Sequence, residues 1–314
     1  MIGIKAIASY MPPKTTDNIA RGAGFGETED FIRSKIGAVR LPLKDVAQET
    51  SDLAVEAVRA LFAKQPALNP AAIDALVVVT QNPDGVGLPH TAAIVQAKLG
   101  LPTHVAAFDV SLGCSGYVYG LFILKGFLEA SGLSNGLLIT ADPYSKIVDP
   151  SDRVTSLLFG DAATASWVGH SPVLSLDAVS YGTDGSGAEF LKNEQSHLRM
   201  NGRQIFSFAA TQVPAHIRSL LAREKLEPDD IDLYFLHQGS AAIVDSIARS
   251  FAPLSSRFIK DITETGNTVS SSIPLLLERH AMDELDGRIL VSGFGVGLSW
   301  ASALISIQKK EIQL

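Results

Sequence analysis

The sequence predicts an α/β protein built from two related halves that share one core. Residues 68–82 and 226–240 each read Leu-x-Pro, then Ile-Asp, then a short apolar run typical of a buried strand. Further paired motifs follow in the same order at nearly the same offset, which indicates an internal repeat. Short apolar runs also alternate with helix-like stretches, and this alternation favours the α/β class.

The repeat has two further pairs of segments. Gly113-Cys114 matches Gly266-Asn267, and the strand-like residues 138–141 match residues 290–293. Helices are expected between the strands at 51–64, 90–99, 115–130, 208–224, 240–251 and 269–283. The halves, residues 1–172 and 173–314, meet near 170–175 without a low-complexity linker, so we expect a shared core rather than independent domains.

Composition limits the function classes. A chain of 314 residues with 46% hydrophobic residues can bury a large core. The start of the chain lacks a signal-peptide pattern, and no apolar run is long enough to span a bilayer, so no membrane association is expected. The formal charge of -7 argues against nucleic acid as a partner. A single cysteine fits a reducing compartment and does not support a metal site, so a cytoplasmic protein without bound metal is expected.

Cys114 lies where an apolar strand changes to a helix whose first residues are small. Glycines on both sides of Cys114-Ser115 permit a sharp turn and the close approach of a substrate. The N-terminus of the following helix favours the thiolate, which is the nucleophilic form. A lone cysteine is more often a small buried hydrophobe, so the residues around it have to decide between the two interpretations.

The second half supplies that context. The repeat places Asn267 at the helix start equivalent to Cys114, and His237 follows the first matched strand of the second half. Open α/β sheets build their sites at strand ends, so the three side chains are expected to converge. Each also has a structural alternative, because a histidine at a strand end is often only hydrogen-bonded in the core, and an asparagine after glycine is often a turn or cap residue.

With these motifs in place, the chain resembles the 3-oxoacyl-(acyl-carrier-protein) synthase III family of the thiolase superfamily over essentially its whole length. The resemblance is carried by an ordered set of motifs: Gly-Cys-Ser-Gly at 113–116, Phe159-Gly160-Asp161, His237-Gln238, Gly266-Asn267-Thr268 and GFGVGLSWASAL at 293–304. It implies the thiolase fold, with five αβαβα layers, and a homodimer. Thiolases use a second cysteine and the elongating synthases use Cys-His-His, so the set here resembles the Cys-His-Asn branch, which includes initiating synthases, plant-type polyketide synthases and some acyltransferases.

The resemblance implies a two-step reaction without a permanently bound cofactor. An acyl-CoA would acylate Cys114, and a malonyl thioester on acyl carrier protein would then lose carbon dioxide in a Claisen condensation. Donors from His237 and Asn267 would stabilise the enolate. The backbone N–H groups of Cys114 and Gly297 would form the oxyanion hole, although Gly297 taken on its own is more typical of a plain turn residue.

Several further residues match substrate-binding positions of the family. Arg153 matches an arginine at the nucleotide end of CoA, while Phe159 and Phe206 belong to the substrate tunnel. Phe31 and Lys35 stand where the family commonly has a tryptophan and an arginine around adenine. Because lysine lacks the planar fork of arginine and phenylalanine is a smaller platform, weaker CoA binding or a carrier-bound donor is also expected from these residues.

Two other positions affect the expected specificity. The family's His-Gln-Ala-Asn run reads His237-Gln238-Gly239-Ser240 here, so one active-site amide is replaced by a hydroxyl. Leu88 matches the residue that closes the acyl pocket across the dimer. These departures suggest a specialised synthase, and they leave the acyl chain length and the pathway open.

Two other functions stay open. Cys114 could pass its acyl group to an amine or hydroxyl without decarboxylation, and the altered Ser240 favours this alternative more than the usual amide would. The chain could also be a non-catalytic partner subunit of an active homologue, although the intact Cys, His and Asn set argues against it. Acylation of Cys114 and malonyl-dependent release of carbon dioxide separate these alternatives.

Overall fold

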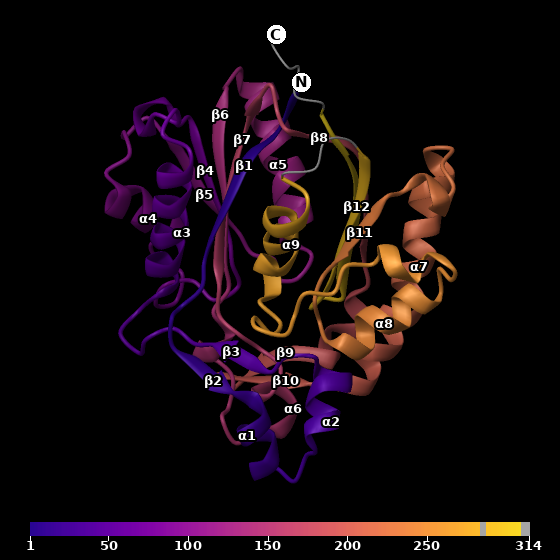
Figure 1. Ribbon diagram of the computed structural model, residues 1–314. Coiled ribbons are helices and arrows are strands. Elements are labelled where there is room, and N and C mark those ends of the chain that lie inside the picture. The colour runs from indigo at the N-terminus through magenta and orange to yellow at the C-terminus, as the bar shows by residue number, and fades with distance from the viewer. Residues whose placement is uncertain (283–286, 309–314) are drawn as a thin grey trace.

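The computed structural model describes residues 1–282 and 287–308, which form five layers of helices and sheets (Figure 1). Helices α3 and α4 cover the outer face of one sheet, and α7 and α8 cover the outer face of the other. Helices α5 and α9 lie between the two sheets. The αβαβα arrangement expected from the sequence is therefore confirmed.

The two sheets repeat one strand order. The first sheet runs β5-β4-β6-β7-β1 and the second runs β11-β12-β13-β8. In each sheet, the strand that comes first in the sequence lies beside the strand that comes last. The order β4-β6-β7-β1 in the first sheet corresponds to β11-β12-β13-β8 in the second. The strands are β1 (Ile2–Tyr10), β4 (Ala75–Val79), β5 (Ala106–Val110), β6 (Asn135–Ala141), β7 (Ala163–His170), β8 (Leu174–Thr183), β11 (Leu233–Leu236), β12 (Gly287–Gly295) and β13 (Ser299–Ile307).

The second half also has a remnant of a fifth strand. Phe258 forms an isolated parallel bridge with Tyr234 of β11, in the position that β5 occupies beside β4. The two sheets join where Gly3 and Ile4 of β1 pair with residues at the start of β8. The chain passes from β7 into β8 between His170 and Leu174, so the strands of the two layers are joined by one continuous series of hydrogen-bonded neighbours.

The expected helices are present with small shifts of their ends. They are α3 (Thr50–Lys64), α4 (Thr91–Leu99), α5 (Gly116–Ser131), α7 (Gly202–Arg223), α8 (Ala241–Arg249) and α9 (Ser272–His280). Helix α7 begins six residues before the expected 208, because Asn201 caps it by accepting a hydrogen bond from the Gln204 N–H (3.2 Å). The last residue of the expected helix 269–283 lies outside the described residues. No described helix combines the length and apolar character that a bilayer crossing requires.

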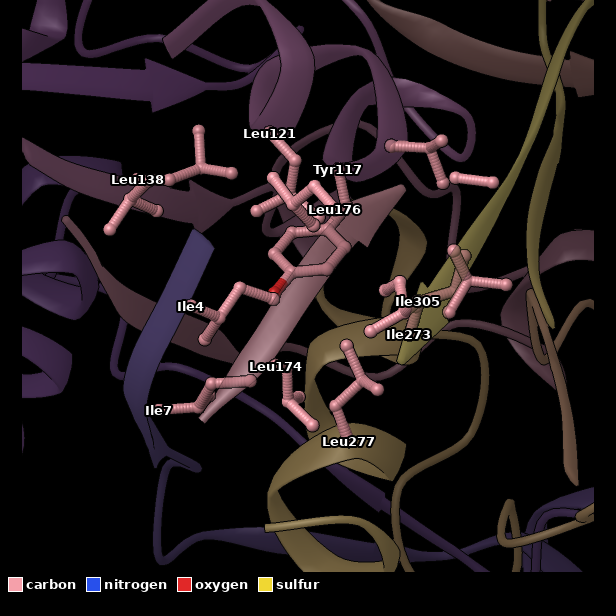
Figure 2. Packing of buried hydrophobic residues seen from close by; sticks show 14 of the residues in the cluster. Ile4, Ile7, Tyr117, Leu121, Leu138, Leu174, Leu176, Ile273, Leu277 and Ile305 are labelled. Carbon is pink, nitrogen blue, oxygen red and sulfur yellow. The ribbon is translucent and has the colours of Figure 1, made fainter. Parts of the chain in front are cut away.

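The largest core cluster surrounds the two central helices (Figure 2). Tyr117 and Leu121 of α5 face Ile273 and Leu277 of α9, and strands from both sheets close around them. The Tyr117 hydroxyl is paired with Ser166 Oγ at 3.0 Å, so this buried polar group is satisfied. Burying each large aliphatic side chain here contributes about 1.5–3 kcal/mol, which makes this shared layer a main source of stability.

Glycines allow α5 to lie close against the first sheet. A Cβ on Gly116 would stand 2.4 Å from Val79 Cγ1, and a Cβ on Gly120 would stand 2.8 Å from Leu138 Cδ1. Both distances are too short for carbon atoms in contact. The small residues at the start of α5 therefore fix the depth at which its N-terminus, and the cysteine before it, sits between the sheets.

A cap of short elements lies at the end of the layers away from both termini (Figure 1). These elements are β2 (Thr15–Asp17), α1 (Asn18–Gly24), α2 (Glu29–Phe31), β3 (Arg40–Pro42), α6 (Arg153–Ser156), β9 (Leu191–Glu194) and β10 (His197–Met200). The N-terminus of α5 points toward this end, so the cap covers the region where the strand-end residues gather.

Candidate active site

A cavity of about 210 Å³ lies between the cap and the two central helices. Cys114 of the first half reaches it together with His237 and Asn267 of the second half. The convergence expected from the repeat is therefore observed. Its other lining residues are Phe31, Lys35, Ile36, Arg153, Val154, Leu158, Phe159, Leu191, Met200, Gly202, Ile205, Phe206, Gly239, Ser240, Ile243, Phe294 and Gly295.

Cys114 sits immediately before α5 and is 5% exposed. The loop at the end of β12 passes so close that a Cβ on Gly295 would lie 2.8 Å from the Cys114 Sγ. Glycine is required there because any side chain would displace the sulfur. The thiol is thus held between the start of one central helix and the backbone of the opposite sheet.

The protonation state of Cys114 differs from the sequence expectation. Burial, followed by the nearby charge of Asp142, raises the pKa of the Cys114 thiol to about 12. Backbone N–H groups of Val296 and of Cys114 itself act in the opposite direction. The expected thiolate preference from the helix N-terminus is therefore wrong for the unliganded protein, because desolvation outweighs the helix and the N–H groups.

The backbone N–H that faces the thiol belongs to Val296, not to Gly297. Gly297 does not line the cavity, and its φ of 137° carries the chain from β12 into β13, with its Cα turned toward Ser299. The N–H that faces the thiol therefore lies one residue before Gly297, the position expected from the sequence, and both residues belong to the same glycine-rich turn. The tertiary structure alone shows which N–H points inward.

His237 follows β11 and is 3% exposed. Burial lowers the pKa of its imidazole to about 3, so the ring is neutral over the physiological range. Its Nδ1 lies 2.8 Å from Ser272 Oγ of α9, and that hydroxyl also lies 3.1 Å from the Val269 carbonyl oxygen. The Ser272 hydroxyl can therefore donate its one proton either to His237 Nδ1 or to the Val269 carbonyl oxygen. The first arrangement goes with the imidazole proton on Nε2, and the second allows it on Nδ1.

The side-chain amide of Asn267 has a fixed orientation. Its Oδ1 accepts a hydrogen bond from the Val269 N–H at 2.9 Å, and its Nδ2 donates to the Gly239 carbonyl at 3.4 Å. Val269 has a φ of 53°, an unusual conformation for a β-branched residue that costs on the order of 1–3 kcal/mol. This strained turn directs the amide nitrogen of Asn267 toward the cavity side.

Ser240 has a structural role as well as a place in the cavity wall. Its Oγ accepts a hydrogen bond from the Ile243 N–H (3.3 Å) and so caps α8. Gly239 leaves room beside the histidine, because a Cβ there would stand 3.6 Å from His237 Nε2. The replacement of the family's usual residues thus widens the space next to the imidazole.

The residues expected to bind the nucleotide all line this cavity. They are Phe31, Lys35, Arg153 and Phe206. Phe206 is 38% exposed, which is unusual for a large apolar side chain and typical of a binding surface. The guanidinium of Arg153 is paired with the carboxylate of Glu27.

Leu88 does not reach the cavity of its own chain. It lies in the loop between β4 and α4 and is 90% exposed, close to Val86, which is 94% exposed. The sequence did not predict four other residues near the reacting groups, namely Ser272, Val269, Gly295 and Tyr144. Of these four, only Ser272 could have been found from the sequence. It lies at the start of the helix expected after Asn267, where a hydroxyl can reach a side chain at a strand end such as His237.

Comparison with known proteins places this site in a family. The family model described as 3-oxoacyl-[acyl-carrier-protein (ACP)] synthase III C terminal matches residues 221–307, and the model for 3-oxoacyl-[acyl-carrier-protein (ACP)] synthase III matches residues 108–185. The chain is 33% identical to the beta-ketoacyl-[acyl-carrier-protein] synthase III of Lactococcus lactis subsp. lactis, over 97% of this chain and 98% of the relative. The protein of the same name from Caldanaerobacter subterraneus is also 33% identical, with 98% of both chains covered.

Solved structures agree with the sequence relatives. A crystal structure of 3-oxoacyl-(acyl-carrier-protein) synthase III superposes with a TM-score of 0.89 at 33% identity, covering 97% of this chain and 99% of that chain. The 3-oxoacyl-(acyl-carrier protein) synthase of Burkholderia xenovorans gives 0.89 at 32% identity, covering 98% and 94%. The expected thiolase fold is thereby confirmed. The chain belongs to the 3-oxoacyl-(acyl-carrier-protein) synthase III family, a group of acyl-transferring condensing enzymes in the thiolase superfamily.

Proposed function

We propose that this enzyme forms a carbon–carbon bond between an acyl group carried on Cys114 and a malonyl thioester on acyl carrier protein. One observation supports this proposal above all: a buried cysteine, a neutral histidine and an oriented asparagine amide line a single cavity. This donor set matches the two charges that such a reaction develops, an oxyanion on the acyl group and an enolate on the malonyl group.

In the first half-reaction, an acyl thioester exchanges its thiol for Cys114. Because the thiol starts protonated, a base has to accept its proton as the sulfur attacks. His237 Nε2 serves as this base when its Nδ1–H donates to Ser272 and Ser272 donates to the Val269 carbonyl. The proton then passes to the departing thiolate of the donor, so the cysteinyl thioester and a free thiol are the products.

The tetrahedral oxyanion of this step forms next to two backbone donors. The N–H groups of Cys114 and Val296 both favour negative charge at the sulfur, and they are the proposed oxyanion hole. Gly295 keeps the loop close enough for the Val296 N–H to reach the reacting atoms. Removing one such donor typically costs about 10²–10³ in rate.

In the second half-reaction, the malonyl carboxylate leaves as carbon dioxide and its electron pair forms an enolate. Asn267 Nδ2 donates a hydrogen bond to the enolate oxygen. His237 does the same from Nε2–H in its other neutral tautomer, which forms when Nδ1 releases its proton to solvent and Nε2 takes one up; Ser272 then donates to the bare Nδ1. The enolate carbon attacks the acyl carbonyl, the bond to Cys114 breaks, and the thiolate takes a proton. The low pKa of His237 keeps the imidazole neutral, which suits it to donate from Nε2–H. As the base of the first step it holds the proton only in passing, on the way to the departing thiolate.

The nucleotide end of CoA is proposed to lie against Phe31, Lys35, Arg153 and Phe206, with Phe159 deeper in the tunnel. Glu27 competes with a CoA phosphate for Arg153. Glu27→Gln is therefore expected to strengthen CoA binding about 2–5-fold, measured by calorimetry. Glu56→Gln, which breaks the pair with Arg59 on α3, is the matched control and should leave CoA affinity unchanged. Equal effects of the two substitutions would show that Glu27 does not compete.

A homodimer in the cytoplasm is the proposed working form. The exposed side chains of Val86 and Leu88 form an apolar tip on one loop, which a second copy would cover. A reactive cysteine without a disulfide partner suits a reducing compartment. Analytical ultracentrifugation of the wild type and of Leu88→Glu tests this association, and a dimer that survives the substitution unchanged would argue against the loop as an interface.

Intact-mass spectrometry tests the proposed reaction. The protein is incubated with a panel of acyl-CoAs, with Cys114→Ala as the control, and malonyl-carrier protein is then added. A Cys114-dependent mass gain that malonyl-carrier discharges with release of carbon dioxide and a 3-oxoacyl product is the expected result. If the adduct is discharged only by an amine or hydroxyl acceptor, the function is acyl transfer and not condensation. The absence of any adduct would favour a non-catalytic subunit.

A further inference from the structure

A second cavity of about 210 Å³ lies on the other side of the oxyanion loop. It begins at Val296, whose side chain also packs beside Gly113, so it adjoins the turn that carries the nucleophile. Its lining residues are Gln81, Asn82, Ser111, Tyr144, Ile147, Lys192, Asn193, Leu198 and Val296. Six of these nine side chains are polar, whereas the first cavity is lined mainly by apolar groups.

Tyr144 is the buried polar group of this second cavity. It is 2% exposed and packs on Phe159, with 4.8 Å between the ring centroids, in the same cluster as Cys114. Within residues 1–282 and 287–308, no hydrogen-bond partner is found for its hydroxyl. The hydroxyl oxygen of Tyr144 is not one of the enclosed unpaired atoms of the described residues, so it opens into the cavity and is free to donate a hydrogen bond to a ligand there.

Gln81 supplies a second unused polar group. Its backbone N–H is bonded to Asp142, but its side-chain amide has no partner in the described part of the chain. The amide oxygen lies over the turn before Cys114, since a Cβ on Gly113 would stand 2.6 Å from it. Tyr144 therefore offers a donor and Gln81 an acceptor within one cavity that adjoins the acyl-carrying residue.

The charges around this cavity oppose an anionic ligand. The Lys192 ammonium is held by Glu189 and Glu194, each at 2.8 Å, so its positive charge is already balanced. Burial and the nearby charges of Asp142 and Cys114 raise the pKa of Tyr144, which keeps its hydroxyl protonated as a donor. The surroundings thus suit a neutral group that both accepts and donates a hydrogen bond.

We propose that this cavity selects a short hydroxyl-bearing acyl group, with Tyr144 donating to the substrate hydroxyl and Gln81 accepting from it. The inference rests on the proposed acylation of Cys114. The cavity is smaller than the roughly 300–1,000 Å³ typical of sites for drug-sized ligands, which limits the acyl group to a few carbons. A site with buried polar groups rejects an analogue that lacks the matching hydroxyl, because those groups then stay unpaired.

The test compares butyryl-CoA with (R)- and (S)-3-hydroxybutyryl-CoA, which differ by one hydroxyl. Single-turnover acylation of Cys114 is expected to be about tenfold faster or more with one hydroxyacyl isomer than with butyryl-CoA. Tyr144→Phe should remove this preference by slowing the hydroxyacyl reaction alone. Tyr181→Phe, which deletes a hydroxyl from a tyrosine outside both cavities, is the matched control and should keep the preference. Equal acylation by all three donors would overturn the proposal.

Binding to Cys114→Ala separates this inference from the proposed chemistry. Calorimetry with the same thioesters measures selection without acylation. Tighter binding of a hydroxyacyl thioester that Tyr144→Phe abolishes would support the cavity's role even if the wild type never became acylated. No difference in affinity between butyryl- and hydroxybutyryl-CoA, together with no difference in acylation, would overturn the selection of a hydroxyl group.

Discussion

The two halves of this protein share one strand order but place opposite kinds of residue at equivalent positions. The first central helix is preceded by Cys114 and the second by Asn267. The position equivalent to His237 at the end of β11 is Val79 at the end of β4, a buried core residue. The residue after β6 is the buried acid Asp142, and its equivalent in the second half is Phe294.

This difference fits a division of the proposed reaction between the two halves. In that proposal the first half holds the nucleophile, and the second half holds the groups that donate to developing negative charge. The fold positions each strand end without fixing its chemistry, so the repeat predicts where polar side chains meet and not what they do. The following predictions test this division of labour between the halves.

The largest effect is expected from Cys114→Ala. The first half then has no nucleophile, so acylation and all condensation through it should disappear, a loss of at least about 10³-fold. Intact-mass measurement after incubation with acyl-CoA reports the adduct. Acylation of the Cys114→Ala protein would show that the nucleophile is another residue, which would contradict the proposed division of roles between the two halves.

Asn267→Ala should separate the two half-reactions. Acylation of Cys114 is expected to stay near the wild-type rate, whereas the malonyl-dependent step should slow by about 10²–10³-fold because the enolate loses a fixed donor. His237→Ala should slow both steps, since the imidazole serves both. Quenched-flow measurement of adduct formation and discharge distinguishes these patterns, and equal losses for the two variants in each step would contradict separate roles.

The matched glycines before these residues should differ in their tolerance of a side chain. Gly266 has a φ of 63°, and a Cβ there would meet Leu41 Cδ2 at 2.3 Å and the Leu158 carbonyl oxygen at 2.9 Å. Gly266→Ala is expected to lower the free energy of unfolding by about 3–4 kcal/mol. A Cβ at Gly113 would meet Gln81 Oε1 at 2.6 Å, Val296 Cγ1 at 3.0 Å and Val269 Cγ1 at 3.4 Å. The nearest of these is the end of a flexible side chain and none is backbone, so Gly113→Ala should cost under about 1.5 kcal/mol. Urea denaturation of both variants gives the difference, and similar losses would show that the two turns are equally constrained.

The smallest effect concerns Asp142, which has no acidic counterpart in the second half. Burial raises its pKa to about 7 although the Gln81 N–H and side chains of Asn82, Ser270 and Thr80 donate to it. Because the pKa in the folded state exceeds the ordinary 3.8, the stability it contributes is fully present below about pH 3.8 and is lost as the pH rises through 7.

The wild type should therefore lose about 2–3 kcal/mol more unfolding free energy between pH 5 and pH 8 than Asp142→Asn does. Denaturant titrations at both pH values measure this difference. Asn keeps an acceptor for the Gln81 N–H. Because the change in unfolding free energy between the two pH values is compared within each protein, the variant does not need to have wild-type stability at either pH. Parallel pH dependence of the two proteins would show that Asp142 is already ionised at pH 5.

Patterns within single segments explain what could be predicted. Apolar periodicity located the strands and most helix ends, and the repeat brought Cys114, His237 and Asn267 to one place before any contact was known. Helix α7 was underestimated because its first turns contain Gly202 and polar residues that local propensity does not favour, while a cap and the cavity wall stabilise them.

The chain by itself therefore determined the class of fold, the internal repeat and the meeting of Cys114, His237 and Asn267 at one cavity, because these follow from periodicity, glycine placement and residue chemistry along the sequence. Only the tertiary structure decided which backbone N–H faces the thiol, that Cys114 starts as a thiol, and that the Tyr144 hydroxyl opens into a cavity beside it with no hydrogen-bond partner among the described residues. Those properties depend on desolvation and on distances of a few ångströms between segments far apart in the chain, and no local pattern encodes them.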